Sequence, residues 1–227
     1  MNAIKKNLQK INTKIREFER RYKRKKDSVS LVAVSKRQSA QRIKDAFLSG
    51  QKSFGENYLQ EAVLKQEELR DLDIEWHFIG NIQSNKTQEV AQRFDWVHSV
   101  SRMKVIERLN RYRPQYKPPL NVLIQLNTSR EATKAGAQPN ELKDLVENIM
   151  VQPRLQLRGL MGLPEPSSSF ESKRARIRQI VSLAKPYHPE MDVLSIGTSH
   201  DFEAAIAEGA TLLRLGTALF GARSSIP

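Results

Sequence analysis

Short apolar runs alternate with longer amphipathic stretches along most of this chain of 227 residues. The apolar runs are rich in Val, Ile, Leu, Phe and Trp, which is typical of buried β-strands. They predict strands over Leu31–Ser35, Ser53–Glu56, Glu75–Ile79, Trp96–Val100, Asn121–Leu126, Gln156–Met161, Val193–Ile196 and Thr211–Leu215.

Each predicted strand is separated from the next by a stretch whose apolar positions lie three or four residues apart, which predicts a helix. These helices are Ala40–Leu48, Tyr58–Leu69, Lys86–Arg93, Lys104–Tyr112, Glu141–Met150, Lys173–Ala184 and Phe202–Ala207. Such alternation argues for a parallel sheet with crossover helices. Eight units without a long linker favour closure over an open sheet, so we predict an α/β fold consisting of a single (β/α)8 barrel domain over residues 1–227.

Residues 1–26 predict an additional amphipathic helix before the first strand. Its apolar residues alternate by four and three positions: Ile4, Leu8, Ile11, Ile15, Phe18 and Tyr22. This spacing forms one apolar stripe on a helix, with lysines and arginines on the solvated faces. The last strand is followed only by residues 216–221 and a short polar tail, which leaves no full eighth helix. We therefore expect the N-terminal helix to cover that gap.

The chain is strongly basic, with a net charge of +13 and a sequence pI near 10.0. This charge calls for an anionic partner, which could be nucleic acid, an acidic membrane surface, an acidic protein or a phosphorylated small molecule. Much of it lies in the N-terminal helix, and no aromatic RNA-binding signature accompanies it. We therefore favour a packed helix with a basic outer face over a nucleic-acid-binding arm.

Several segment types are not expected from this sequence. The longest apolar run falls well short of the ~18 residues that a membrane span requires, and residues 1–10 lack the apolar core of a secretory signal. The chain has no cysteine, so disulfide and thiolate chemistry are excluded, which suits a reducing compartment. We expect a cytoplasmic monomer without a membrane partner.

Lys36 is the first candidate for chemistry, because it follows the strand Leu31–Ser35 directly. In barrels of this kind the functional groups gather at the carboxyl ends of the strands. An ammonium group placed there loses water, which disfavours its charged form and yields a nucleophile that can form a Schiff base with an aldehyde. The alternative is a solvated loop lysine, one of 38 Lys and Arg residues.

Two neighbouring strand ends have the composition of an anion site. The residues concerned are Ser195, Gly197, Thr198 and Ser199 after the seventh strand and Gly216 and Thr217 after the eighth. Glycines allow close approach of the backbone, hydroxyl groups donate hydrogen bonds, and a following helix adds oriented N–H groups. Phosphate sites of barrels frequently use these two loops. The alternative is an ordinary capped helix start.

A phosphate site opposite a strand-end lysine suggests pyridoxal 5′-phosphate, whose aldehyde requires a lysine. Arg214, beside the second phosphate loop, is a candidate partner for the ring nitrogen, although an ion pair with Glu56 or Asp201 would explain it equally. A guanidinium cannot accept a proton from the ring, so it would leave the pyridine nitrogen unprotonated and the ring a weak electron sink.

The histidines give weaker indications. His77, His98, His188 and His200 show no metal-ligand spacing, so we predict no metal site. His77 lies close to a strand end, but a hydrogen-bonded structural histidine is the favoured interpretation.

Ordered motifs across nearly the whole chain carry a family resemblance. They are Val32–Lys36, Phe54–Glu61, Trp76–Lys86, Asn127–Gly136, Gly159–Met161 and Arg214–Gly221. With these motifs the chain closely resembles the pyridoxal-phosphate homeostasis protein family, whose fold is similar to the N-terminal barrel of alanine racemase. The resemblance implies that Lys36 forms the Schiff base, that Asn57 lines the ring and that Arg214 faces the ring nitrogen. It places Ser195, Gly197, Ser199, Gly216 and Thr217 around the phosphate.

The seventh strand departs from the family pattern. The family usually has Ser-Met-Gly-Met-Ser there, whereas this chain has Ile196 and Thr198 in place of both methionines. Because the glycine and the serines are kept, we expect phosphate binding to persist, with Thr198 adding a hydroxyl group of open effect.

Three functions compete: a pyridoxal-phosphate carrier that supplies apo-enzymes, an amino-acid racemase or lyase, and a nucleic-acid-binding protein. Alanine-racemase-like enzymes carry a second domain that supplies a tyrosine base, and the chain printed above stops six residues after Gly221. The sequence shows no obvious second base opposite Lys36. We therefore expect cofactor binding without efficient turnover and no catalytic residue. Lys134 either guides the phosphate at the mouth of the pocket or is simply solvated.

Overall fold

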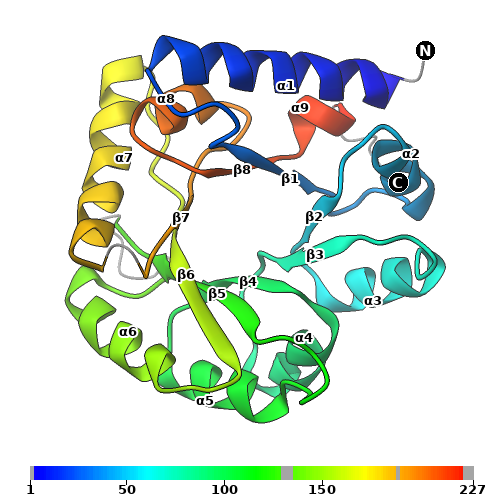
Figure 1. The fold of residues 1–227 in the computed structure, drawn as a ribbon, viewed down its shortest axis with the longest axis vertical. Helices are drawn as coiled ribbons and strands as arrows, with labels where there is room; N and C mark the ends of the chain where they lie inside the picture. Colours follow the sequence, from blue (N-terminus) through cyan, green and yellow to red (C-terminus); the bar gives the residue numbers. More distant parts are fainter. Residues whose placement is uncertain (1–2, 129–134, 188–189, 222–227) are drawn as a thin grey trace.

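Eight parallel strands form a closed barrel in the order β1 to β8, within the residues that the computed structural model describes (3–128, 135–187 and 190–221) (Figure 1). The strands are β1 Ser30–Val34, β2 Ser53–Glu56, β3 Glu75–Phe78, β4 Trp96–Val100, β5 Leu120–Leu126, β6 Leu155–Gly162, β7 Val193–Ser195 and β8 Leu212–Leu215. The ring closes between β1 and β8, where Val32 lies opposite Arg214. The predicted barrel is therefore confirmed.

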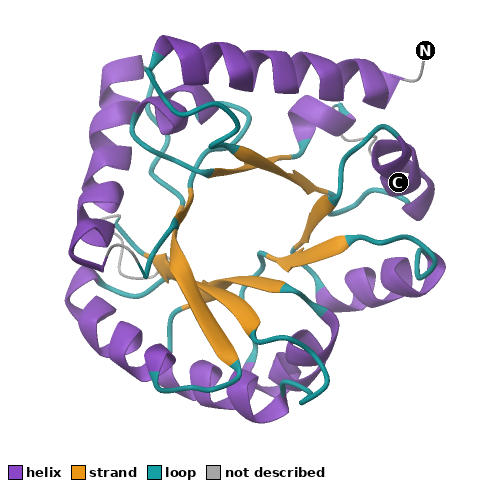
Figure 2. Cartoon of the chain, viewed as in Figure 1, coloured by secondary structure: helices purple, strands orange, loops and turns teal. Residues whose placement is uncertain are grey.

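Helices surround the strands on the outside of the ring (Figure 2). They are α1 Ala3–Arg21, α2 Ala40–Leu48, α3 Leu59–Glu68, α4 Thr87–Arg93, α5 Met103–Tyr112, α6 Leu142–Met150, α7 Phe170–Ala184, α8 Phe202–Ala207 and α9 Thr217–Phe220. Helix α7 begins three residues before the predicted Lys173, because the side chain of Ser169 accepts a hydrogen bond from the Ser172 N–H and caps the first turn. None of the helices in the described ranges is long and apolar enough to span a bilayer.

Helix α1 lies alongside α8 and α9, and it also contacts α2 (Figure 1). Its buried apolar side chains are the predicted stripe from Ile4 to Phe18, and Tyr22 packs beside them half-buried. Helix α9 has only four residues, and the Asn7 side-chain amide donates to the Leu219 carbonyl at 3.0 Å. The N-terminal helix thus occupies the space that a longer eighth helix would fill.

Helix α1 ends at Arg21 rather than at the predicted residue 26. Lys23 adopts a left-handed conformation with φ 53°, its N–H bonds the Arg20 carbonyl, and the Arg24 N–H bonds the Glu19 carbonyl. This is the Schellman arrangement that terminates a helix. The Arg24 side chain then bonds the carbonyl groups of Ile206 and Ala210 and ties the end of α1 to α8.

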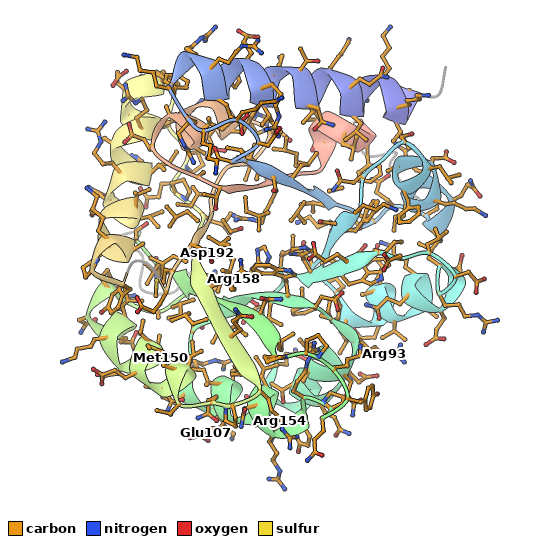
Figure 3. All side chains as sticks on the ribbon, in the orientation of Figure 1. Arg93, Glu107, Met150, Arg154, Arg158 and Asp192 are labelled. Atoms are coloured by element: carbon orange, nitrogen blue, oxygen red, sulfur yellow. The ribbon has the colours of Figure 1, made fainter. Side chains whose placement is uncertain are left out.

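Side chains fill the space inside the ring of strands, as Figure 3 shows. Trp96, Leu123 and Met161 form a small apolar cluster of buried residues, separate from the larger core between the strands and the helices. The interior of the barrel is therefore a packed core and not an open channel.

Candidate cofactor site

A cavity of about 260 Å³ lies at the carboxyl ends of the strands. Its lining residues come mainly from the ends of β1, β2, β6 and β8 and from the loop after β7. They are Val34, Lys36, Gln38, Asn57, Ile79, Met161, Leu163, Thr198, Ser199, His200, Arg214, Gly216, Thr217 and Gly221. The amine, the guanidinium and three of the four hydroxyl groups that the sequence singled out thus share one cavity.

Seven of the nine candidate residues line this cavity, and two do not. The seven are Lys36, Asn57, Thr198, Ser199, Arg214, Gly216 and Thr217. Ser195 is fully buried below the cavity, where it contacts Arg214. Gly197 adopts φ +112°, and a Cβ there would lie 2.7 Å from Leu213 and 2.9 Å from Ala205. Gly197 therefore gives the loop its path against the core, whereas Ser195 supports a lining residue.

A buried ion pair braces the strand end that carries Lys36. The Lys65 ammonium on α3 lies 2.6 Å from the Glu56 carboxylate and 2.7 Å from the Ser35 carbonyl, and the Ser35 hydroxyl donates to Glu56 at 2.6 Å. Burial raises the pKa of Glu56, and attraction to Lys65 opposes that rise. These contacts join β1, β2 and α3 at Ser35, the residue that precedes the half-buried Lys36.

Arg214 is held from below and faces the cavity. Its Nη1 bonds the hydroxyl and the carbonyl oxygen of Ser195, and its Nη2 donates to the Gly162 carbonyl at 3.0 Å. These contacts use three of the five guanidinium N–H groups and leave two for a ligand. Burial lowers the pKa of Arg214 to about 10, partly offset by Asp201, so the side chain stays cationic at neutral pH.

The ion pair with Glu56 that the sequence left open for Arg214 does not form, because Glu56 pairs with Lys65. Asp201 attracts Arg214 through its charge, but its carboxylate accepts from the hydroxyl and the N–H of Thr198, at 2.8 and 2.6 Å.

This contact also shows what the hydroxyl of Thr198 does. It donates within its own loop, so its hydrogen is engaged there, and Ile196, the other replacement, is fully buried in the core. The Ser199 hydroxyl instead accepts from the Ala218 N–H at 3.3 Å, which leaves its own hydrogen for an anion. A Cβ at Gly216 would lie 3.1 Å from the Val34 carbonyl oxygen, so the loop after β8 runs close against the end of β1.

Sequence reasoning missed three polar or flexible positions on the cavity wall. Gln38, His200 and Gly221 line it, and they lie in loops beyond the strand ends. Lys134 and His188 lie outside the described residues. Among the described residues, no group of three His, Asp or Glu side chains is arranged to hold a metal ion.

The Asn57 side chain offers an acceptor to a ligand. Its Oδ1 atom is buried and has no hydrogen-bond partner within the described structure. The backbone of Asn57 is fixed by Gly80, where a Cβ would lie only 1.9 Å from the Asn57 carbonyl oxygen. A polar atom left without a partner at a cavity wall fits a site that is completed by a ligand.

Comparison with known proteins identifies the family. A family model described as "Alanine racemase, N-terminal domain" matches residues 3–224. A protein of Pseudomonas aeruginosa named pyridoxal phosphate homeostasis protein is 48% identical over 223 residues, which cover 98% of this chain and 97% of that protein. The chain belongs to the pyridoxal phosphate homeostasis protein family. Another member, from Escherichia coli strain K12, is 46% identical and covers 98% of each chain.

Solved structures agree with membership of the pyridoxal phosphate homeostasis family. PipY of Synechococcus elongatus, whose structure is described as having PLP bound, is 34% identical, with a TM-score of 0.84 over 96% of this chain and 100% of that one. Alanine racemase from Corynebacterium glutamicum is 17% identical, with a TM-score of 0.68 over 99% of this chain and 62% of that one. At that identity the second likeness shows the barrel fold alone.

Proposed function

We propose that this protein binds pyridoxal 5′-phosphate in the cavity at the strand ends, as a Schiff base on Lys36, and holds it for supply to other proteins without efficient turnover. The observation that carries the proposal is the convergence of an amine, a guanidinium and hydroxyl-bearing loops on one cavity of about 260 Å³. The PLP-bound structure of PipY and the names of the relatives support it.

The lining residues fit the three parts of the cofactor. The cofactor supplies an aldehyde, to which the Lys36 amine adds with loss of water. Ser199, Gly216 and Thr217 would hold the phosphate. The Oδ1 atom of Asn57, which has no partner in the described structure, would accept a hydrogen bond from a donor near the ring.

Arg214 argues for binding rather than catalysis. Its guanidinium remains a donor at neutral pH, because its pKa of about 10 lies well above 7. It would therefore donate to the ring nitrogen and leave it unprotonated, which weakens the cofactor's capacity to stabilise a carbanion. Together with the lack of an obvious second base opposite Lys36 in the sequence, this cation favours a carrier over an enzyme.

The visible absorbance of the purified protein tests the binding proposal. We expect a yellow band with added cofactor that is absent in Lys36→Ala and present in the control Lys44→Ala, an exposed lysine on α2. A colourless wild type that takes up no cofactor would overturn the proposal. Retention of the band in Lys36→Ala would show that another amine carries the bond.

The second candidate function is an amino-acid racemase or lyase, favoured by one observation. His200 is exposed at the rim of the cavity and could act as a base. It follows Ser199 directly, however, and so belongs to the proposed phosphate side. Exchange of the α-proton of L-alanine in D₂O decides between the two functions: rapid exchange that is lost in His200→Ala would establish an enzyme, and its absence supports the carrier.

The supply role requires that the cofactor leave the site. We propose that the loaded protein, acting as a monomer, passes it to apo-enzymes that depend on pyridoxal phosphate. The test is the reactivation of such an apo-enzyme in the presence of a trap for free cofactor. Reactivation that the trap abolishes would show release to solvent instead of transfer.

A further inference from the structure

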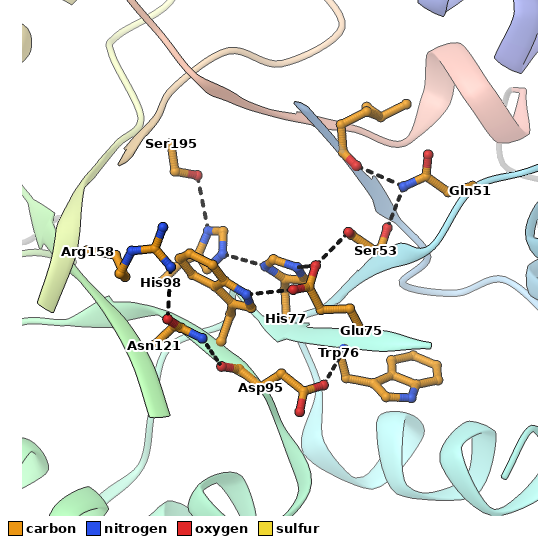
Figure 4. A network of polar contacts seen from close by, with 12 residues as sticks. Gln51, Ser53, Glu75, Trp76, His77, Asp95, His98, Asn121, Arg158 and Ser195 are labelled. Carbon is orange, nitrogen blue, oxygen red and sulfur yellow. Dashed lines mark hydrogen bonds and ion pairs between the residues drawn. The ribbon is translucent and has the colours of Figure 1, made fainter. Parts of the chain in front are cut away.

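A chain of polar side chains, buried except for Glu75 at its outer end, runs from Glu75 through His77 and His98 to Ser195 in the barrel interior (Figure 4), and Ser195 in turn contacts Arg214. The Glu75 carboxylate at the start of β3 lies 3.0 Å from His77 Nε2, and His77 Nδ1 lies 2.9 Å from His98 Nε2. His98 Nδ1 lies 3.0 Å from the Ser195 hydroxyl, which also contacts the guanidinium of Arg214. These four contacts cross β3, β4, β7 and β8, and none of the first three residues lines the cavity.

The two ends of the chain fix the direction of every hydrogen bond in it. A guanidinium can only donate, so the Ser195 hydroxyl accepts from Arg214 and has its own hydrogen left to give to His98 Nδ1. At the other end a carboxylate can only accept, so His77 Nε2 donates to Glu75. With both rings neutral, His98 Nε2 must then donate to His77 Nδ1. Both histidines therefore carry their proton on Nε2.

The surroundings favour the neutral state of His98. His77 and His98 are 1% and 0% exposed, and burial holds the pKa of His98 well below 6.5, which the nearby charge of Arg214 reinforces. Glu75 stays ionised because its hydrogen bond from His77 lowers its pKa to about 2. Ser53 and Trp96 also donate to that carboxylate, at 2.6 and 2.9 Å.

Packing keeps the rings in place. The Trp96 ring stacks on His77 at 5.4 Å between centroids, and the guanidinium of Arg158 lies 4.9 Å from the centre of the Trp96 ring. Neither ring nor hydroxyl can turn without breaking a buried hydrogen bond, which costs more than the net worth of that bond.

We propose that His98 and His77 are positioning residues for cofactor binding, which orient the Ser195 hydroxyl and through it hold Arg214 toward the ring nitrogen. This inference rests on the proposed function. It gives residues at the far end of the barrel a role in the cavity. The Glu75 carboxylate sets the direction of the hydrogen bonds along the chain, and these bonds orient the Ser195 hydroxyl so that its oxygen accepts from the guanidinium of Arg214.

The first test needs no cofactor. Nitrogen-15 NMR of the full-length protein, labelled at histidine and free of ligand, reports which ring nitrogen carries the proton. At pH 7.5 we expect His98 to be neutral with its proton on Nε2, and His77 to accept that hydrogen on Nδ1 and to donate from Nε2. In Glu75→Gln, which keeps the size of the side chain but removes its charge, we expect both preferences to weaken together. An Nδ1-protonated or charged His98 in the wild type would overturn the proposed chain.

The second test measures the cofactor itself by titration of its visible band. His98→Leu removes the acceptor for Ser195, and we expect about 5- to 10-fold weaker binding, the worth of about one hydrogen bond, with a shifted absorption maximum. His98→Gln, which can accept from Ser195 and donate to His77, should bind within about twofold of the wild type. Ser99→Ala is the matched control, since this buried neighbour on β4 donates to the Gly80 carbonyl instead of to the chain.

Each outcome bears on one proposal. Wild-type affinity and an unshifted band in His98→Leu would overturn the positioning role, as would an equal loss in the Leu and Gln variants. If His98→Leu does not fold, Glu75→Gln takes its place, with an expected loss of about 2- to 3-fold, and wild-type affinity there would count against the chain. If the wild type binds no cofactor, the proposed function fails, while the NMR measurement still decides the arrangement of the histidines.

Discussion

Replacing Lys65 by Met tests the buried ion pair that supports the Lys36 strand end. The ammonium contacts Glu56, Glu61 and the Ser35 carbonyl within 2.7 Å, and the residue Lys65 is only 5% exposed. Without it, the fully buried Glu56 keeps only the Ser35 hydroxyl, since its Oε2 atom already has no partner in the described structure. Removing one partner of a buried pair costs about 3–5 kcal/mol, because the remaining charge is left uncompensated in a medium of low dielectric.

Urea denaturation at pH 7 measures this loss, and a parallel thermal melt should show a drop of about 6–20 °C for a chain of this size. Glu56→Gln combined with Lys65→Met removes both charges and should recover most of the stability. Exposed Lys44→Ala serves as a control and should change the free energy of unfolding by less than about 0.5 kcal/mol.

The pH dependence gives an independent check of the same reasoning. Burial raises the folded-state pKa of Glu56 above its ordinary value, and loss of Lys65 should raise it further, because the ion pair lowers it. The folded state then holds this proton more tightly than the unfolded state, so the stability of Lys65→Met should rise as the pH falls from 7 toward 4.5. A loss below about 1 kcal/mol in Lys65→Met, or no recovery in the double variant, would refute the account.

Three further predictions concern other parts of the barrel. The pKa of Glu75 is lowered from 4.5 to about 2, so its contribution to stability is present above pH 4.5 and is lost as the pH falls toward 2. After allowance for the 44% exposure of the Glu75 side chain, we expect this contribution to be about 1–2 kcal/mol. An acid denaturation curve that is unchanged in Glu75→Gln would contradict this. Gly80→Ala places a Cβ 1.9 Å from the Asn57 carbonyl oxygen, so we expect the free energy of unfolding to fall by at least about 2 kcal/mol and cofactor binding to weaken. A normal melting temperature would show that the loop moves aside without cost. Ile15→Ala on α1 should cost about 2–5 kcal/mol in urea denaturation, because Ile15 is 1% exposed, whereas the outward Lys14→Ala serves as its control; equal effects of the two would mean that α1 is not part of the core.

Much of the fold was predictable because its pattern is local. The eight apolar runs and the amphipathic stretches between them gave the strands and helices of the barrel, with boundaries displaced by a few residues. The displaced boundaries depend on contacts that composition does not show. The Ser169 cap extends α7 backward, and the left-handed Lys23 ends α1 early, although lysine is not a residue that usually marks a helix end.

The candidate site was predictable to the extent that parallel strands end on one face. That rule brought Lys36, Asn57, Arg214 and the two glycine- and hydroxyl-bearing loops to one cavity. It could not separate residues that line the cavity from those that lie beneath it, as with Ser195 and Gly197. Nor could it find Gln38 and His200, whose loops reach the cavity only through the path that each takes after its strand.

The sequence by itself determined the barrel and the end of it that carries the chemistry, because both follow from local patterns: the hydrophobic periodicity of each element and the alternation of strands with helices. Only the tertiary structure decided which polar groups became partners. His98 and Ser195 are 97 positions apart and meet because closure of the barrel brings β4 and β7 toward a common interior. Lys65 likewise reaches Glu56 only once α3 packs beneath the strand ends. A buried polar group must bond whatever the closed fold places beside it, and that neighbour depends on how the whole chain packs.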